Sequence, residues 1–147
     1  MPAAVEWDEA QVLTRVTITE SGCWRWLKPQ RDGCALVVSH GVCMVAHRFV
    51  YQLLVGPIPD GLVLDHLCHN DDPKCPGGVT CPHRACVYPS HLEPVTQAKN
   101  SQREKAQRTH CPQGHPYAGW NLILYQGRRY CRACTYRRTN AARRAGR

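Results

Sequence analysis

The chain is poor in the residues that build a large apolar core, and it has no long apolar run. Only one of its 147 residues is phenylalanine, whereas 11 are glycine and 11 are proline. A chain of this length forms one domain, or one domain with a small appendage, and a modest core usually needs additional cross-links. No apolar run is long enough to span a bilayer, and the first residues lack the basic and apolar regions of a signal peptide. The sequence therefore indicates a cytoplasmic protein with no membrane partner.

Cysteine and positive charge, in contrast, are abundant. The chain has ten cysteines, and in a cytoplasmic protein Cys-x2-Cys spacing next to histidines favours zinc over disulfides. The formal net charge is +8 at pH 7. One zinc ion bound by four thiolates and another bound by three thiolates and an imidazole would lower this charge to roughly +5. A basic chain of this kind suits a polyanionic partner such as nucleic acid.

The segment from residue 62 to residue 92 carries the residue types needed to hydrolyse a phosphodiester. Its apolar start predicts a strand that ends in the adjacent pair Asp65 and His66, and His91 follows a proline further on. Neighbouring residues on a strand point to opposite sides. A neutral His66 can take a proton from water, while Asp65 and His91 can bind Mg²⁺, which needs only one or two protein ligands. The segment therefore predicts a general base and a divalent ion on two sides of one phosphate.

These residues resemble the His-Asn-His (HNH) endonucleases of the ββα-metal, or His-Me finger, class, and most of all the small members found in bacteriophage genomes. The resemblance begins at Gly22 and ends at Asn100. The pieces that carry it are Gly22-Cys23-Trp24, Ala46-His47-Arg48, Gly56 to Gly61, Asp65-His66-Leu67-Cys68 and Pro89-Ser90-His91-Leu92-Glu93.

The resemblance implies that His66 is the general base and that Asp65 and His91 bind Mg²⁺ or another divalent ion such as Mn²⁺ or Ni²⁺. It also implies double-stranded DNA as substrate, a phage or mobile-element origin and the cytoplasm of a bacterial host. A monomer with one such site is expected to nick one strand. The family's middle asparagine falls at Tyr88, which cannot cap the following turn as asparagine does. Tyr88 is therefore a further site residue, either a phosphate contact or the cause of weakened activity.

The loop between the two catalytic segments predicts a first structural zinc. Four thiolates around one Zn²⁺ make a closed tetrahedral site, which would clamp a loop that has little apolar content of its own. His69 and His83 are alternative ligands. The predicted ligands are Cys68, Cys75, Cys81 and Cys86.

The last third of the chain predicts a second structural zinc and resembles a zinc-ribbon or treble-clef finger. A Cys-x3-His knuckle and a Cys-x2-Cys knuckle flank an expected hairpin, which is a strong zinc signature. A redox Cys-x2-Cys is a poor alternative, because no βαβ pattern surrounds it. The predicted ligands are Cys111, His115, Cys131 and Cys134.

The first half of the chain is expected to form a small antiparallel sheet and a helix. Alternating residues predict a three-stranded layer, and an apolar stripe predicts an amphipathic helix over residues 46–55. The three remaining cysteines lie on these strands, where burial as small apolar side chains is expected and a third metal site stays open. The strands are expected at 23–27, 34–38 and 42–45, and the cysteines are Cys23, Cys34 and Cys43.

Two helices are expected after the loop, a short one over residues 89–94 and a longer one over 97–108 with Thr96 as its cap. The longer helix and the C-terminal arginines favour contact with phosphates, since arginine binds phosphate oxygens in pairs. The residues predicted to bind DNA are Arg48, Lys99, Asn100, Arg103, Arg128, Arg129, Arg132, Arg137 and Arg138.

Together these patterns predict an α+β protein in which a small antiparallel sheet and a helix lead into a ββα-metal HNH core. The HNH nuclease domain is expected at residues 1–108, and the finger with its basic tail at 109–147. Two alternatives stay open. The first is a zinc-stabilised DNA-binding protein with weakened or absent nuclease activity, and the second is an accessory factor of phage DNA packaging with packaging proteins as partners.

Overall fold

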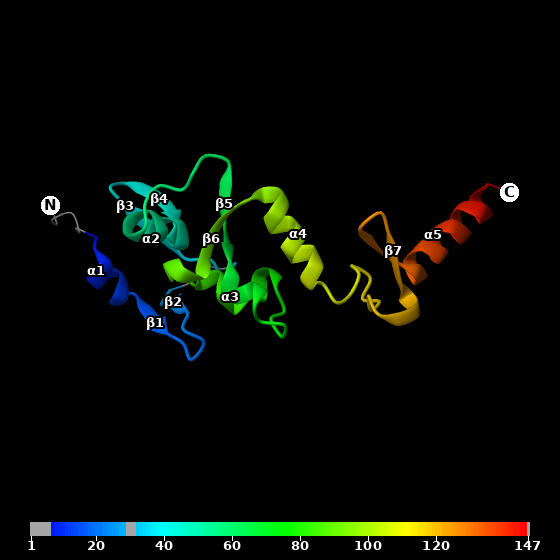
Figure 1. The fold of residues 1–147 in the computed structure, drawn as a ribbon, viewed down its shortest axis with the longest axis horizontal. Coiled ribbons are helices and arrows are strands. Elements are labelled where there is room, and N and C mark those ends of the chain that lie inside the picture. The colour runs from blue at the N-terminus through cyan, green and yellow to red at the C-terminus, as the bar shows by residue number, and fades with distance from the viewer. Residues whose placement is uncertain (1–6, 29–31, 147) are drawn as a thin grey trace. The chain divides into compact units, whose positions relative to one another are not determined.

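The computed structural model describes residues 7–28 and 32–146, and it has the mixed α+β architecture that the sequence predicts. Within these residues the strands form four separate two-stranded antiparallel sheets, connected by helices and short 3-10 turns (Figure 1). The chain divides into two compact units, Met1–Arg103 and Glu104–Arg147. None of the described helices is long and apolar enough to cross a membrane.

The first unit contains ten elements in the described residues. Between α3 and β6, three 3-10 turns interrupt a long loop, at Gly78–Thr80, Pro82–Ala85 and Pro89–His91. In chain order the helices and strands are α1 (Glu9–Leu13), β1 (Val16–Ile18), β2 (Trp24–Trp26), β3 (Leu36–Ser39), β4 (Val42–Val45), α2 (Ala46–Leu54), β5 (Leu62–His66), α3 (Leu67–Asn70), β6 (Leu92–Thr96) and most of α4 (Gln97–Gln107).

The predicted three-stranded layer is wrong, because β2 pairs with β1 while β3 and β4 form a sheet of their own. The β-branched residues of β1 favour a strand, and the tight turn after them makes pairing with β2 entropically cheap. The Thr19 N–H group donates to the Cys23 carbonyl across this turn. Gly22 has a φ of +78°, a backbone conformation that side chains other than glycine rarely adopt. The turn therefore fixes Cys23 at the start of β2.

The main core is built around α2, and the predicted helix over 46–55 is confirmed to within one residue at its end. Ala46, Phe49 and Val50 are buried on one face of this helix, as the apolar stripe predicts. Val87, far along the chain, belongs to the same core, and its N–H group donates to the Trp24 carbonyl. The buried residues of the cluster are Val12, Trp26, Ala35, Val37, Ala46, Phe49, Val50 and Val87.

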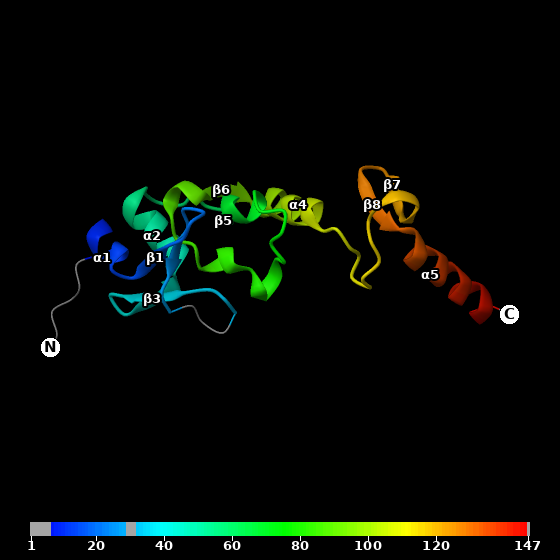
Figure 2. The same ribbon diagram turned by 90° about the horizontal axis from the view of Figure 1, so that it is seen from below.

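The second half of the first unit is a β-hairpin followed by a helix. Strands β5 and β6 are antiparallel, with Asp65 opposite Glu93 and His66 opposite Leu92. The short helix expected over residues 89–94 is wrong beyond its first turn, because Leu92 and Val95 are buried as strand residues of β6. Helix α4 then begins at Gln97, where the Thr96 hydroxyl accepts from the Lys99 N–H group as predicted. Figure 2 shows α4 directly after the β5–β6 pair.

The second unit is a small hairpin and a helix. Strand β7 (Leu122–Tyr125) pairs with β8 (Arg128–Cys131), and α5 (Arg132–Ala145) follows at once. Before the hairpin, the Cys111 N–H group donates to the His115 carbonyl and the Gly114 N–H group donates to the Cys111 carbonyl. These bonds fold residues 111–115 into a knuckle.

Candidate active site and metal centres

Strand β5 ends in two adjacent polar residues that line one open pocket. Asp65 is buried, although it is charged, and His66 is half-buried. The pocket extends over the loop that follows α3. Its lining residues are Leu64, Asp65, His66, His69, Gly78, Cys81, His83 and Arg84.

The carboxylate of Asp65 is held by the two helices that flank it. Its Oδ2 atom accepts from Asn70 Nδ2 on α3 at 2.7 Å and from Arg103 Nη1 on α4 at 2.7 Å. The same Nη1 atom also donates to Glu93 Oε2 at 2.5 Å. The hydrogen bonds to Asp65 and Glu93 raise the pKa of Arg103, and the bond from Arg103 lowers the pKa of Glu93. Arg103 thus links the carboxylates of Asp65 and Glu93 beside the pocket.

The imidazole of His66 is oriented by the backbone. Its Nε2 atom lies 3.1 Å from the Cys86 carbonyl oxygen, and because a carbonyl only accepts, Nε2 carries the proton in this bond. The Nδ1 atom is then left without a proton and can accept one. Burial lowers the pKa of His66, although the bond to the Cys86 carbonyl acts in the opposite direction. A neutral imidazole with a fixed tautomer is the form that a general base requires.

A second histidine lies against His66. The ring centroids of His47, on α2, and His66 are 4.9 Å apart. Burial is the largest cause that lowers the pKa of His47 to about 3. His47 is therefore an uncharged packing partner of His66 near neutral pH.

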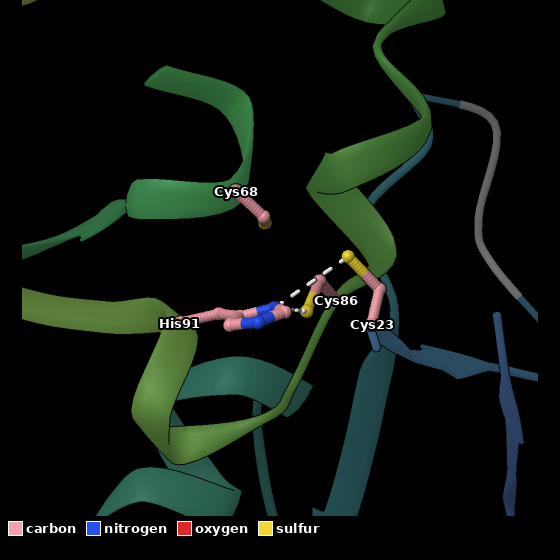
Figure 3. A group of neighbouring side chains, drawn as sticks. All are labelled: Cys23, Cys68, Cys86 and His91. Atoms are coloured by element: carbon pink, nitrogen blue, oxygen red, sulfur yellow. Dashed lines mark hydrogen bonds between the residues drawn. The ribbon is translucent and has the colours of Figure 1, made fainter. Parts of the chain in front are cut away.

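The structure brings His91 into a group of cysteines. His91 Nδ1 lies 3.6 Å from Cys23 Sγ and 3.6 Å from Cys86 Sγ, and Cys68 completes a group of four (Figure 3). Among the described residues, Asp65 belongs to no group of three or more potential metal ligands. The 3-10 turn before β6 places His91 among the thiols, whereas Asp65 lines the pocket with His66.

The geometry of this group fits a tetrahedral zinc ion. Zn–S bonds of about 2.3 Å and Zn–N bonds of about 2.0–2.1 Å place sulfur and nitrogen ligands about 3.6 Å apart, which is the separation observed. Cys23 and Cys86 are 4% and 0% exposed, and both are free thiols. A hydrogen bond with Cys68 lowers the pKa of Cys86 to about 5, and the same bond raises the pKa of Cys68. The lowered pKa of Cys86 favours the thiolate, the form that binds metal.

The predicted four-cysteine ligand set is divided between two places. Cys68 and Cys86, at the two ends of the loop, lie with Cys23 and His91. Cys75 and Cys81, at its middle, lie with His69 instead. The sequence predicts apolar packing for Cys23, and the signal for a ligand role is its place in the Gly22-Cys23-Trp24 piece of the resemblance.

Tyr88 packs beside the Cys23, Cys68, Cys86 and His91 group. Its ring stacks on Trp24 at a centroid distance of 4.7 Å and meets the His91 ring edge-on at 4.9 Å. As expected for tyrosine, it makes no side-chain cap on the turn that follows. Its contacts are those of a residue that supports the position of His91.

The structure brings together all four residues predicted to bind the second zinc. His115 Nδ1 lies 3.4 Å from Cys111 Sγ and 3.3 Å from Cys134 Sγ, and the two sulfur atoms are 3.7 Å apart. Cys131 belongs to the same group. Burial raises the pKa of Cys131, but hydrogen bonds from the Cys134 backbone and the Asn121 side chain outweigh this and lower the pKa to about 6.

The residues predicted to bind DNA have different surroundings. In the first unit, Lys99 is paired with Glu93 at 3.2 Å, Arg103 holds Asp65, and Arg48 and Asn100 are half-buried. In the second unit, Arg129 and Arg132 lie over the rings of Tyr117 and Trp120, each at 5.1 Å. Arg137 reaches Cys134 Sγ at 3.9 Å. Arg128 and Arg138 are exposed.

A family model described as HNH endonuclease matches residues 45–72. This stretch includes α2, β5 and α3, and with them His47, Asp65, His66 and Cys68. No curated protein and no solved structure matches the chain. The match supports an HNH family and, at that level, a nuclease-type function with DNA as substrate.

Proposed function

We propose that this chain is a metal-dependent endonuclease that nicks double-stranded DNA. The observation that carries the proposal is the fixed tautomer of His66, whose Nε2 donates to the Cys86 carbonyl, so that Nδ1 is the nitrogen that can accept a proton. Asp65 lines the same pocket one residue away. The family match over both residues supports the same assignment.

In the proposed reaction, His66 Nδ1 takes a proton from a water molecule. The water oxygen forms a bond to phosphorus, and the bond from phosphorus to the leaving sugar oxygen breaks. Burial keeps the imidazole neutral and ready to accept the proton. The Cys86 carbonyl holds the ring in place, so the residue that orients the base also belongs to the thiol group.

Asp65 is proposed as the first ligand of the catalytic ion, which is Mg²⁺ or another divalent ion such as Mn²⁺ or Ni²⁺. When bound, such an ion neutralises charge on the phosphate and on the leaving oxygen. Asn100 lies three residues before Arg103 on α4, and residues at this spacing share a helix face. Asn100 is therefore proposed as the second oxygen ligand in place of His91. Arg103 is proposed to position Asp65.

Zinc ions are proposed to have structural roles. One is assigned to Cys23, Cys68, Cys86 and His91, and another to Cys111, His115, Cys131 and Cys134. The finger and the arginines of α5 are proposed to bind phosphates along the duplex. A single catalytic centre per chain favours nicking over double-strand cleavage. A phage or mobile-element origin is proposed from the resemblance of the site segments to that group.

The test is cleavage of supercoiled plasmid by the wild type and by His66→Asn, with Mg²⁺, Mn²⁺ and Ni²⁺ in turn. Removing a general base typically costs about 10²–10⁴-fold in rate, so nicking is expected to fall by at least about 100-fold. Affinity for uncleaved DNA, measured by fluorescence anisotropy, is expected to stay unchanged. His40→Asn makes the same chemical change at an exposed turn and is the matched control. Equal nicking by His66→Asn and the wild type would refute the assignment of the base.

DNA binding with little or no cleavage is the second candidate function. It is favoured by the state of Asp65, whose Oδ2 already accepts from both Asn70 and Arg103. In this case the wild type binds duplex DNA but does not nick it with any of the three ions, and Tyr88→Asn gains activity. The endonuclease proposal predicts the reverse: the wild type nicks, and Tyr88→Asn only loses the stacking on Trp24, which thermal melting would detect.

A further inference from the structure

The loop between α3 and β6 contains a second cluster of thiols and imidazole that the proposed active site does not use. His69 Nδ1 lies 3.2 Å from Cys75 Sγ and 3.5 Å from Cys81 Sγ. The two sulfur atoms are 3.3 Å apart. Three potential ligand atoms therefore surround one point, and none of them belongs to the group formed by Cys23, Cys68, Cys86 and His91.

These separations fit a shared metal ion. A tetrahedral zinc ion places sulfur and nitrogen ligands about 3.6 Å apart and two sulfur ligands about 3.8 Å apart. The ligand-to-ligand distances in this cluster differ from these values by at most about 0.5 Å. The distances in the group of Cys111, His115 and Cys134 agree with them to within the same margin. Thiolate and imidazole are the ligands that select zinc over hard ions such as Mg²⁺.

A disulfide is the main alternative, and the cluster argues against it. Cys75 and Cys81 are free thiols whose sulfur atoms are 3.3 Å apart, whereas a disulfide bond is about 2.05 Å long. A disulfide would also give no reason for an imidazole nitrogen to approach both sulfur atoms. The backbone at Gly77 lies against the His69 ring. A Cβ atom added at Gly77, whose φ is +69°, would lie 3.7 Å from His69 Cε1.

Two further side chains stand beside the cluster at a suitable place for a fourth ligand. His83 Nε2 and Asp72 Oδ2 are 3.1 Å apart, and one potential ligand atom of each residue lies within 4.8 Å of Cys75 Sγ. His83 is buried, and its Nδ1 atom lies 3.7 Å from Cys23 Sγ in the other group. A metal-binding histidine commonly donates its other ring N–H to a carboxylate, and His83 Nε2 is placed to do so to Asp72.

We propose that His69, Cys75 and Cys81 bind a Zn²⁺ ion of their own, with the fourth position on the side of Asp72 and His83. Cys68 belongs to the group with Cys23, Cys86 and His91, whereas the next residue, His69, belongs to this cluster. Adjacent residues of α3 are therefore assigned to different ions. His69, Cys81 and His83 also line the pocket that contains Asp65 and His66. The ion therefore holds one wall of that pocket, a role that rests on the proposed endonuclease function, whereas the binding of zinc does not.

The first experiment measures the zinc content of the full chain by elemental mass spectrometry. The double variant Cys75→Ser and Cys81→Ser is expected to contain one zinc equivalent fewer than the wild type. Cys43→Ser removes an exposed thiol that belongs to none of the ligand groups among the described residues, and it is expected to leave the zinc content unchanged. A double variant that keeps the zinc content of the wild type would overturn the proposal.

A second experiment uses the wild type and does not depend on how the variants fold. In zinc-loaded protein, alkylation with iodoacetamide followed by peptide mapping is expected to leave Cys75 and Cys81 protected. After chelation both are expected to react as fast as Cys43. Reaction at the rate of Cys43 before chelation, or recovery of the two residues as a disulfide-linked pair, contradicts the proposal.

A third measurement shows whether the loop holds an ion separate from that of the other group. Cys23→Ser is expected to lose one zinc equivalent, and combining it with Cys75→Ser and Cys81→Ser is expected to lose two. Loss of a single equivalent in the combined variant would mean that all these residues share one ion. Zinc content and thiol protection do not require cleavage, so these results stand even if the chain never nicks DNA.

Discussion

Replacing Cys23 by serine tests whether the turn between β1 and β2 contributes a metal ligand. Cys23 Sγ lies 3.6 Å from His91 Nδ1 and is grouped with Cys68 and Cys86. The side chain is 4% exposed, so apolar packing is the competing explanation, and it is the one that the sequence favours. Serine keeps the size of the side chain but replaces the thiolate with a poor zinc ligand.

The expected magnitude follows from the metal affinity. Changing even an outer partner of a ligand typically weakens metal binding by about 10–100-fold, so losing a direct thiolate is expected to cost at least about 100-fold, or about 2.7 kcal/mol. An ion that binds only the folded state transmits this loss to the free energy of unfolding. The first unit, Met1–Arg103, is close to 100 residues long. At this size 1 kcal/mol shifts the melting temperature by about 4–8 °C, which predicts a decrease on the order of 10–20 °C.

The assay is thermal melting of the wild type, Cys23→Ser and Cys43→Ser, each with zinc and after chelation. The decrease for Cys23→Ser is expected with zinc, and after chelation the wild type and the variant are expected to melt together, because the lost contribution passes through the metal. Cys43→Ser is expected to match the wild type in both conditions. A decrease that persists in full after chelation would show that Cys23 acts by packing, and an unchanged melting temperature with unchanged zinc content would remove it from the ligand set.

Three other variants test separate parts of the structure. Phe49→Ala empties a buried position of the core and is expected to lower the free energy of unfolding by about 3–5 kcal/mol in urea titrations, so a loss below 1 kcal/mol would contradict its place there. Arg103→Gln is expected to reduce plasmid nicking without changing zinc content, because Asp65 loses its cationic partner; unchanged nicking would exclude a positioning role. Arg128→Gln combined with Arg138→Gln is expected to weaken DNA binding and to flatten the plot of log affinity against log salt by about 1 per lost phosphate contact, whereas an unchanged slope would exclude both residues from the interface.

Local patterns in the sequence predicted local structure well. The stripe formed by Ala46, Phe49 and Val50 indicated α2 almost to its ends, because helix burial depends on residues three and four apart. The short knuckles around His115 and Cys134 likewise indicated four residues that the structure gathers in one group. In both cases the partners are near in the chain, or joined by a single hairpin.

Partners distant in the chain were not predictable in the same way. Cys23 and His91 are 68 positions apart, and nothing in the spacing of either residue points to the other. The four cysteines of the loop looked like one ligand set because the sequence gives their order but not the path of the backbone between them. The pairing of β2 with β1 was missed because a strand pattern shows a buried face and not the neighbouring strand.

The approach of Cys23 to His91 has a consequence for the order in which the chain becomes structured. A metal shared by these residues closes a ring of chain that includes α2 and β5. In the chain-entropy treatment, a permanent link across a ring of this length removes about 4 kcal/mol of disorder from the unfolded chain, and a reversible metal link contributes only while the ion stays bound. If this group binds zinc as proposed, zinc supply during synthesis is expected to affect how completely the β1–β2 hairpin joins the part of the first unit that contains Asp65 and His66.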